Sequence, residues 1–172
     1  MIKRTLLLVA ACAATAAAQK PTAVGQAKLL WADNAKNVAM AAEDVPESLY
    51  SFRATPDVRT FGEIIGHVAG SQSMFCAMAL GEKPPAEDAV EKTATSKAAL
   101  IAALKQSTSY CERAYAMSDA SAMAMIDVFG AQRTKLFALM LNAAHDDEHY
   151  GNLVTYMRLN KMVPPTSRPA AK

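Results

Sequence analysis

The sequence predicts an all-α protein: a left-handed four-helix bundle with a long crossover between its second and third helices. Alanine, leucine, methionine, glutamate and lysine dominate the 172 residues, and these residue types favour helix. No alternating run rich in valine and isoleucine indicates strands. Four segments repeat apolar residues at helical spacing, and a long polar segment separates the second from the third.

The first two helices are expected near residues 24–42 and 60–81. Pro46 follows the end of the first helix. At the start of the second, Thr60 can cap the helix while Glu63, three residues on, completes a capping box. Their apolar stripes contain Leu30, Trp31, Ala35, Val38 and Ala42 in the first helix, and Phe61, Ile64, Ile65, Val68, Phe75 and Met78 in the second.

The last two helices are expected near residues 96–117 and 134–160, with the fourth ending before "VPP" at 163–165. The connection "GEKPPAEDAVEKTAT" before the third helix is long enough to travel the length of the bundle, so the second and third helices can run parallel. The bundle domain is assigned to residues 19–165. Residues 166–172, "TSRPAAK", have nothing to bury and are expected to be disordered.

The N-terminal residues 1–18 have the layout of a secretory signal peptide. Lys3 and Arg4 precede an apolar run from Leu6 to Ala11, which is too short to span a bilayer, and small residues end at Ala18. We therefore expect an exported protein, periplasmic or extracellular, cleaved before Gln19. The alternative is a lipoprotein anchored through Cys12, because "VAAC" resembles a lipobox.

Charge and cysteine content limit the partners. The chain has 18 Lys plus Arg and 16 Asp plus Glu, and the predicted cleavage removes the excess of two positive charges with Lys3 and Arg4. No basic tract is interleaved with aromatic residues, so no nucleic-acid partner is expected. Cys76 and Cys111 each lie about sixteen residues into their helices. They can form a disulfide if those helices are parallel neighbours, and otherwise are two small buried residues.

All three histidines of the chain fall on apolar helical stripes. His145 and His149 are four residues apart, so they differ by about 40° around a helix and can reach the same point. His67 lies on the second helix among Ile64, Ile65 and Val68. Three neutral imidazoles can bind zinc, nickel or ferrous iron with a position left for water, whereas a lone core histidine is more often a hydrogen-bonding residue.

The segment "HDDEH" also fits the H-x-x-E-H motif of inverted zinc proteases, in which Glu148 would be the general base. That class needs a third ligand downstream, normally a glutamate. No Asp or Glu follows His149, so this reading fails.

The segments "VPESLYSFRATPDVRTFGEIIGHVAGS" and "HDDEHYGNLVTYMRLNKMVPP" resemble the DinB/YfiT-like superfamily of metalloenzymes. The resemblance extends from the first helix to Pro165. It implies a four-helix bundle with a long second connection and a divalent metal held by one histidine of the second helix and two of the fourth, here His67, His145 and His149. Some members are thiol transferases that use the metal to activate a low-molecular-weight thiol.

Several residues near the histidines carry further expectations. Asp146 and Asp147 should point away from the histidine face into solvent, whereas Glu148 lies closer and is a candidate base or fourth ligand. Gly66 and Gly151 lie inside helices beside the histidines, where they favour close approach of neighbouring elements. Arg158 matches a position where the family often has arginine, and it places positive charge in the last helical turn.

Two classes of function follow. The first is a metal-dependent enzyme, a transferase or hydrolase acting on a small molecule such as a thiol. The second is a non-catalytic metal-binding or assembly protein of the cell envelope. No catalytic residue is assigned beyond the metal ligands, and the sequence is compatible with a homodimer.

Overall fold

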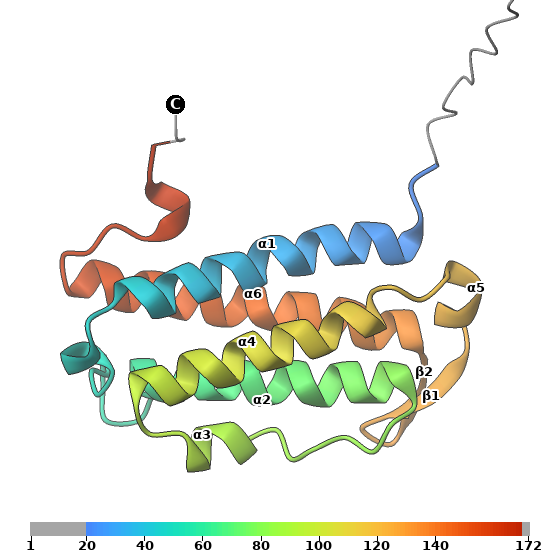
Figure 1. Cartoon of the computed structure of the whole chain (residues 1–172), viewed down its shortest axis with the longest axis horizontal. Coiled ribbons are helices and arrows are strands. Elements are labelled where there is room, and N and C mark those ends of the chain that lie inside the picture. Colours follow the sequence, from blue (N-terminus) through green and yellow to red (C-terminus); the bar gives the residue numbers. More distant parts are fainter. Residues whose placement is uncertain (1–19, 170–172) are drawn as a thin grey trace, which may run out of the picture.

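The computed structural model describes residues 20–169 and confirms the all-α helical bundle (Figure 1). Its four long helices agree with the predicted ranges to within a few residues. They are α1 (Ala23–Asp44), α2 (Phe61–Leu80), α4 (Lys97–Ala114) and α6 (Lys135–Leu159). Shorter elements join them: the 3-10 helices η1 (Glu47–Leu49) and η2 (Pro165–Ser167), the helices α3 (Ala89–Thr93) and α5 (Asp119–Ala122), and the strands β1 (Met125–Val128) and β2 (Ala131–Thr134).

Side-chain caps fix where the long helices begin. The capping box of α2 is confirmed: the Thr60 side chain accepts from the Glu63 amide at 3.1 Å, and the Glu63 carboxylate accepts from the Thr60 amide at 2.6 Å. Thr134 caps α6 with its side chain alone, which accepts from the Phe137 amide at 3.1 Å. Each cap satisfies a backbone donor that the helix leaves without a partner.

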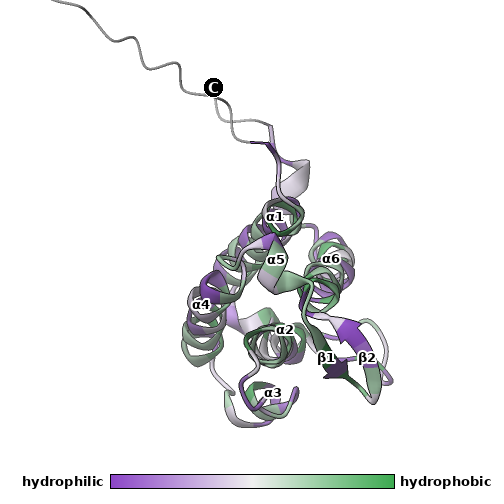
Figure 2. Ribbon diagram, turned by 90° about the vertical axis from the view of Figure 1, so that its right-hand side faces the viewer, coloured by the Kyte–Doolittle hydropathy of each residue, from purple (hydrophilic) through white to green (hydrophobic). Residues whose placement is uncertain are grey.

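The crossover brings α2 and α4 into parallel contact (Figure 1). It carries the short helix α3, which packs along the outer side of α2, as the view along the bundle shows (Figure 2). The question of the two cysteines is settled in favour of a disulfide, which joins Cys76 of α2 to Cys111 of α4, whose Cα atoms are 5.3 Å apart. The disulfide therefore lies in the interior, between α2 and α4, which are parallel because the long crossover connects them.

The core has two apolar halves separated by a polar layer. One half surrounds Phe61 and Leu153, and the other surrounds Trp31 and Leu139. Between them, the buried Gln72 side chain accepts from the Trp31 indole at 2.8 Å and donates to Ser107 at 3.4 Å. The histidines lie in the same stretch of α2 and α6. The polar layer thus places the candidate site halfway along the bundle.

A two-stranded β-hairpin before α6 was not predicted. β1 pairs antiparallel with β2, and the tight turn between them places Phe129 at φ 54° and Gly130 at φ 80°. Two consecutive positive φ angles are typical of the type I′ hairpin turn. The Asp127 carboxylate supports the turn by accepting from the Gly130 amide at 3.0 Å. The hairpin leaves the four-helix class unchanged.

The expected disorder of residues 166–172 is wrong for the part that the structure describes. Tyr150 accepts from the Thr166 amide at 3.1 Å, and Arg168 pairs with Asp44 of α1. Arg158 donates to Ser167 at 3.2 Å from the last turn of α6, so it also ties the helix end to η2. Polar contacts, which an argument from apolar burial overlooks, hold this segment.

Within residues 20–169, no helix is both long and apolar enough to cross a membrane. The predicted signal peptide, residues 1–18, and its alternative lipidation site Cys12 lie outside the described residues.

Candidate metal centre

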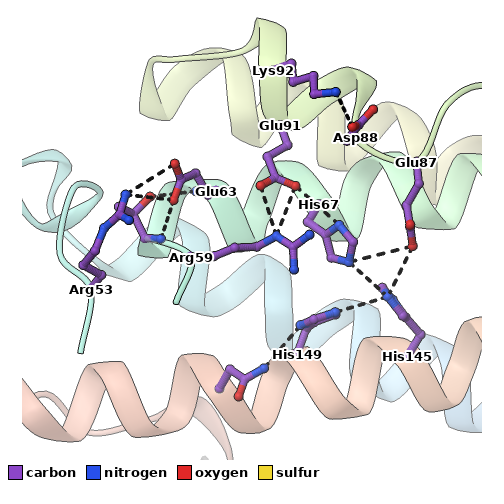
Figure 3. A network of polar contacts seen from close by, with 12 residues as sticks. Arg53, Arg59, Glu63, His67, Glu87, Asp88, Glu91, Lys92, His145 and His149 are labelled. Carbon is purple, nitrogen blue, oxygen red and sulfur yellow. Dashed lines mark hydrogen bonds and ion pairs between the residues drawn. The ribbon is translucent and has the colours of Figure 1, made fainter. Parts of the chain in front are cut away.

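The three histidines converge on one point between α2 and α6 (Figure 3). His145 Nε2 is 3.2 Å from His67 Nε2 and 3.1 Å from His149 Nε2. His67 and His149 are 5% and 7% exposed, and His145 is partly buried. The structure therefore brings together all three residues that the sequence singled out, each with the same ring nitrogen inward.

On the opposite side of each ring, Nδ1 lies near a polar partner. Ser71 is 3.2 Å from His145 Nδ1, and because its hydroxyl donates to the Val68 carbonyl it is left to accept from the imidazole. Asn152 Nδ2 is 3.3 Å from His149 Nδ1 and donates to it, so the Asn152 amide must rotate by 180° to present Oδ1 before it can accept from a protonated Nδ1. Glu91 Oε2 is 3.5 Å from His67 Nδ1, which has no hydrogen-bond partner within the described residues. A proton held on Nδ1 leaves the Nε2 lone pair free to bind a cation.

The surroundings keep the imidazoles neutral. Burial, together with the nearby charges of Arg59 and His149, lowers the pKa of His67 to about 4. Burial, with repulsion from the other two histidines, lowers the pKa of His145 to about 3. Burial also lowers the pKa of His149. At neutral pH protons therefore do not compete for these nitrogens.

The donor set fits a divalent metal. Two nitrogens bound to zinc at about 2.0–2.1 Å in a tetrahedron are separated by about 3.3 Å. The two measured Nε2 separations of 3.1 and 3.2 Å are close to that value. A single proton on His145 Nε2 could serve only one of its two neighbours, whereas one cation satisfies all three lone pairs. Imidazole donors suit zinc, nickel and ferrous iron, so the group could bind a metal whose identity stays open.

The crossover contributes two carboxylates that the sequence argument missed. Glu87 Oε1 is 3.8 Å from His67 Nε2 and 3.7 Å from His145 Nε2. Glu91 accepts from Arg59 Nε with both oxygens, at 3.0 and 3.2 Å, so that Arg59, Glu91 and His67 form a chain (Figure 3). Glu148, the expected acidic neighbour, is exposed and forms no ion pair with a histidine among the described residues, although it lines the pocket beside His149.

The expectation that Asp146 faces solvent is wrong. Its exposed fraction is 0%, and neither carboxylate oxygen has a hydrogen-bond partner within residues 20–169. The physical reason is that α6 packs against both α1 and α2, so its buried face is wide enough to include Asp146 beside the histidines. Asp147 is exposed, as expected. Burial raises the pKa of Asp146 well above its usual range, so it is buried as a neutral acid.

This buried acid predicts how stability depends on pH. Because its folded pKa is raised, the folded protein holds a proton that the unfolded chain releases above about pH 4, and stability falls as pH rises. We expect Asp146→Asn to remove this loss. In metal-free protein, the free energy of unfolding of the variant should therefore exceed that of wild type by an amount that grows by up to about 1.4 kcal/mol for each pH unit above pH 4. Urea unfolding between pH 5 and 8 measures the difference. Exposed Asp147→Asn is the control, and parallel profiles for wild type and Asp146→Asn would refute the prediction.

A pocket of about 720 Å³ opens beside His149. Its walls are the loop before α2 and the facing sides of α2 and α6, and Tyr156 fixes the loop by donating to the Arg59 carbonyl at 2.7 Å. Arg53 and Arg59 line the pocket, but each is paired with a glutamate. Asp57 and Glu148 also line it, so the pocket has no surplus of positive charge to favour an anion. It has room for a small molecule at the histidine cluster.

Close approach explains one of the two helix glycines near the histidines. A Cβ on Gly66 would lie 2.8 Å from the Glu91 Cα, so the crossover rests directly on α2 at this point. Gly70, one turn further on, is tighter still: its Cβ would lie 1.9 Å from the Glu87 carbonyl oxygen. Gly151 has no atom within 4 Å of such a Cβ, so the expectation of close approach there is wrong.

The comparisons with known proteins agree with this architecture. A family model described as the DinB superfamily matches residues 30–153. A DinB-like protein from Bacillus cereus ATCC 10987 is 17% identical over 81% of this chain and 93% of its own, with a TM-score of 0.69. A DinB-like protein from Bacillus subtilis, YjoA, is 19% identical over 85% and 99%, with a TM-score of 0.57. At these identities the likeness concerns the fold. A comparison with curated proteins found no match.

Proposed function

Because this chain belongs to the DinB superfamily and its three histidines converge, we propose that it binds one divalent metal through His67, His145 and His149. The observation that carries the proposal is the approach of the three Nε2 atoms, together with the Ser71 hydroxyl that can accept from His145 Nδ1. Zinc and nickel are the preferred metals, with ferrous iron as an alternative. The metal would serve chemistry on a small molecule, a thiol transfer or a hydrolysis, in the pocket beside His149.

In this proposal the metal and the residues around the histidines have separate roles. When bound, the metal supplies Lewis acidity that makes a water or a thiol nucleophilic near neutral pH. Ser71 would orient His145 by accepting from Nδ1, and Asn152 would orient His149 once its amide is rotated to present Oδ1. Glu91 lies 3.5 Å from Nδ1 of His67 and can accept from it after a small shift. Tyr156 holds the loop that walls the pocket, so a substrate would be enclosed between that loop and His149.

The test begins with metal analysis of tag-free protein, for which we expect one zinc or nickel ion per chain. Thiol transfer to an electrophile and ester hydrolysis are then measured with and without a chelator. Activity that a chelator removes and the metal restores supports the enzyme. Protein that binds no divalent metal contradicts the proposal.

The second candidate is a non-catalytic metal-binding protein of the cell envelope. The observation that favours it is the Glu87 carboxylate, which lies close enough to two histidines to fill a position that an enzyme would leave to water or substrate. One metal per chain with neither activity in the two assays would favour this function.

Export remains part of the proposal. The disulfide between Cys76 and Cys111 supports it, because such bonds form and persist in oxidising compartments. Mass spectrometry of envelope protein should find Gln19 at the N-terminus, or a lipidated Cys12 for the alternative. An intact Met1 in cytosolic protein would contradict both.

A further inference from the structure

The crossover between α2 and α4 runs directly over the histidine cluster. Gly66 and Gly70, one helical turn apart and flanking His67, remove the side chains that would otherwise hold this segment away from α2. The space left by Gly70 is filled by the main chain of Glu87, and that left by Gly66 by the main chain of Glu91. Two backbone contacts thus set the height of both glutamates above the site.

The second of these glutamates is anchored by Arg59. Glu91 holds Arg59 with two hydrogen bonds and lies 3.5 Å from Nδ1 of His67, on the outer edge of the ring. Both oxygens of its carboxylate are therefore engaged by Arg59, which fixes the position of the crossover. The carboxylate does not lie on the inner side of the histidines.

Glu87 lies on the inner side. Its Oε1 is 3.8 and 3.7 Å from the Nε2 atoms of His67 and His145, the nitrogens that face the common point (Figure 3). No hydrogen bond holds the Glu87 side chain among the described residues, and 41% of it is exposed, so the carboxylate is free to adjust by rotation. Glu148, by contrast, is exposed at the pocket beside His149, and no ion pair joins its carboxylate to a histidine among the described residues.

Electrostatics points the same way. Three neutral imidazoles would leave both charges of a divalent cation uncompensated in a half-buried site. Arg59, whose charge depresses the pKa of all three histidines, adds to the positive potential. A carboxylate in the metal's own shell offsets this charge most directly, because the interaction energy falls with distance.

We propose that Glu87 is a fourth protein ligand of the metal, giving a three-histidine, one-carboxylate site whose last ligand comes from the crossover. This inference rests on the proposed three-histidine site. It replaces the expectation of a metal with only three protein ligands, and it makes the crossover part of the metal centre. A ligand on a loop, free of other bonds, can leave the metal when a substrate takes its place.

Cobalt(II) provides the test, because the position and intensity of its visible bands report the donor set without any assay of activity. We expect Glu87→Gln to shift and weaken these bands and to reduce cobalt affinity at least about tenfold, a loss already reached when partners of metal ligands are removed. Glu148→Gln, the competing acidic residue, should match wild type. A cobalt spectrum unchanged by Glu87→Gln overturns the assignment, whatever the affinity does. A wild-type protein that binds no metal would instead refute the three-histidine site itself.

A matched pair of glycine variants gives a second, independent reading. Gly70→Ala places a Cβ against the Glu87 carbonyl and must move the crossover, so its cobalt spectrum should change in the same sense as that of Glu87→Gln. Gly151→Ala, in the same kind of helical position but with open space around it, should keep the wild-type spectrum. A wild-type spectrum in folded Gly70→Ala protein counts against the ligand.

Discussion

Alanine at His67 is expected to weaken zinc binding by more than about 100-fold. Loss of a residue that only supports a ligand costs about 10–100-fold, and loss of a ligand must cost more. His67 is the only histidine that α2 contributes, and without it the two remaining imidazoles come from one face of α6. The same loss is expected for His145→Ala and His149→Ala. Competition with a chromophoric chelator measures the affinities.

Graded controls show whether the loss reflects metal ligation. Ser71→Ala removes the partner of His145 Nδ1, and Asn152→Ala removes that of His149 Nδ1, so each should cost about 10–100-fold. Asp147→Ala, on the exposed face of α6, should have no effect. Far-UV circular dichroism should show unchanged helix content in every variant. If His67→Ala binds one zinc with unaltered affinity, the three-histidine site is wrong.

The fold could be predicted because its main determinants are local. Apolar periodicity marked the four long helices, and the Thr60 and Glu63 capping box marked one helix start to within a residue. The hairpin was not predicted because its strands are only four residues long, which is too short for an alternating pattern to be recognised. The ordered structure of the C-terminal segment was also not predicted, because contacts such as that of Arg168 with Asp44 join residues far apart in the chain.

The site could be predicted only as far as helical geometry extends. His145 and His149 share a face by their spacing, and His67 was placed by its apolar neighbours. Asp146 was misplaced because a residue's spacing from the histidines does not show how wide the buried face of α6 is. Glu87 and Glu91 lie in a connection without periodicity, so nothing local indicated that they reach the histidines. The one available signal was the pair of glycines on either side of His67. Two glycines one turn apart leave a helix surface without side chains, against which another segment of the chain can pack closely.

Reduction of the disulfide between Cys76 and Cys111 is expected to lower the free energy of unfolding by about 4 kcal/mol. The cross-link closes a loop with a sequence separation of 35 residues, which includes the whole crossover. It therefore lowers the conformational entropy of the crossover segment in the unfolded chain, and this is the long connection that the folded bundle must order. Because both cysteines are fully buried, reduction in native buffer should be slow, so the reduced protein is best prepared in urea and refolded.

Urea unfolding of the oxidised and reduced forms measures the difference, and alkylated thiols counted by mass spectrometry confirm the redox state. For a domain of this size, 4 kcal/mol corresponds to a fall in melting temperature of about 8–16 °C. Since the helices keep their apolar contacts, the reduced protein should still fold at 25 °C and bind cobalt with an unchanged spectrum. Coincident unfolding curves would show that the cross-link adds no stability. A lost cobalt spectrum in folded, reduced protein would instead show that the parallel alignment of α2 and α4 is needed to hold the crossover over the histidines.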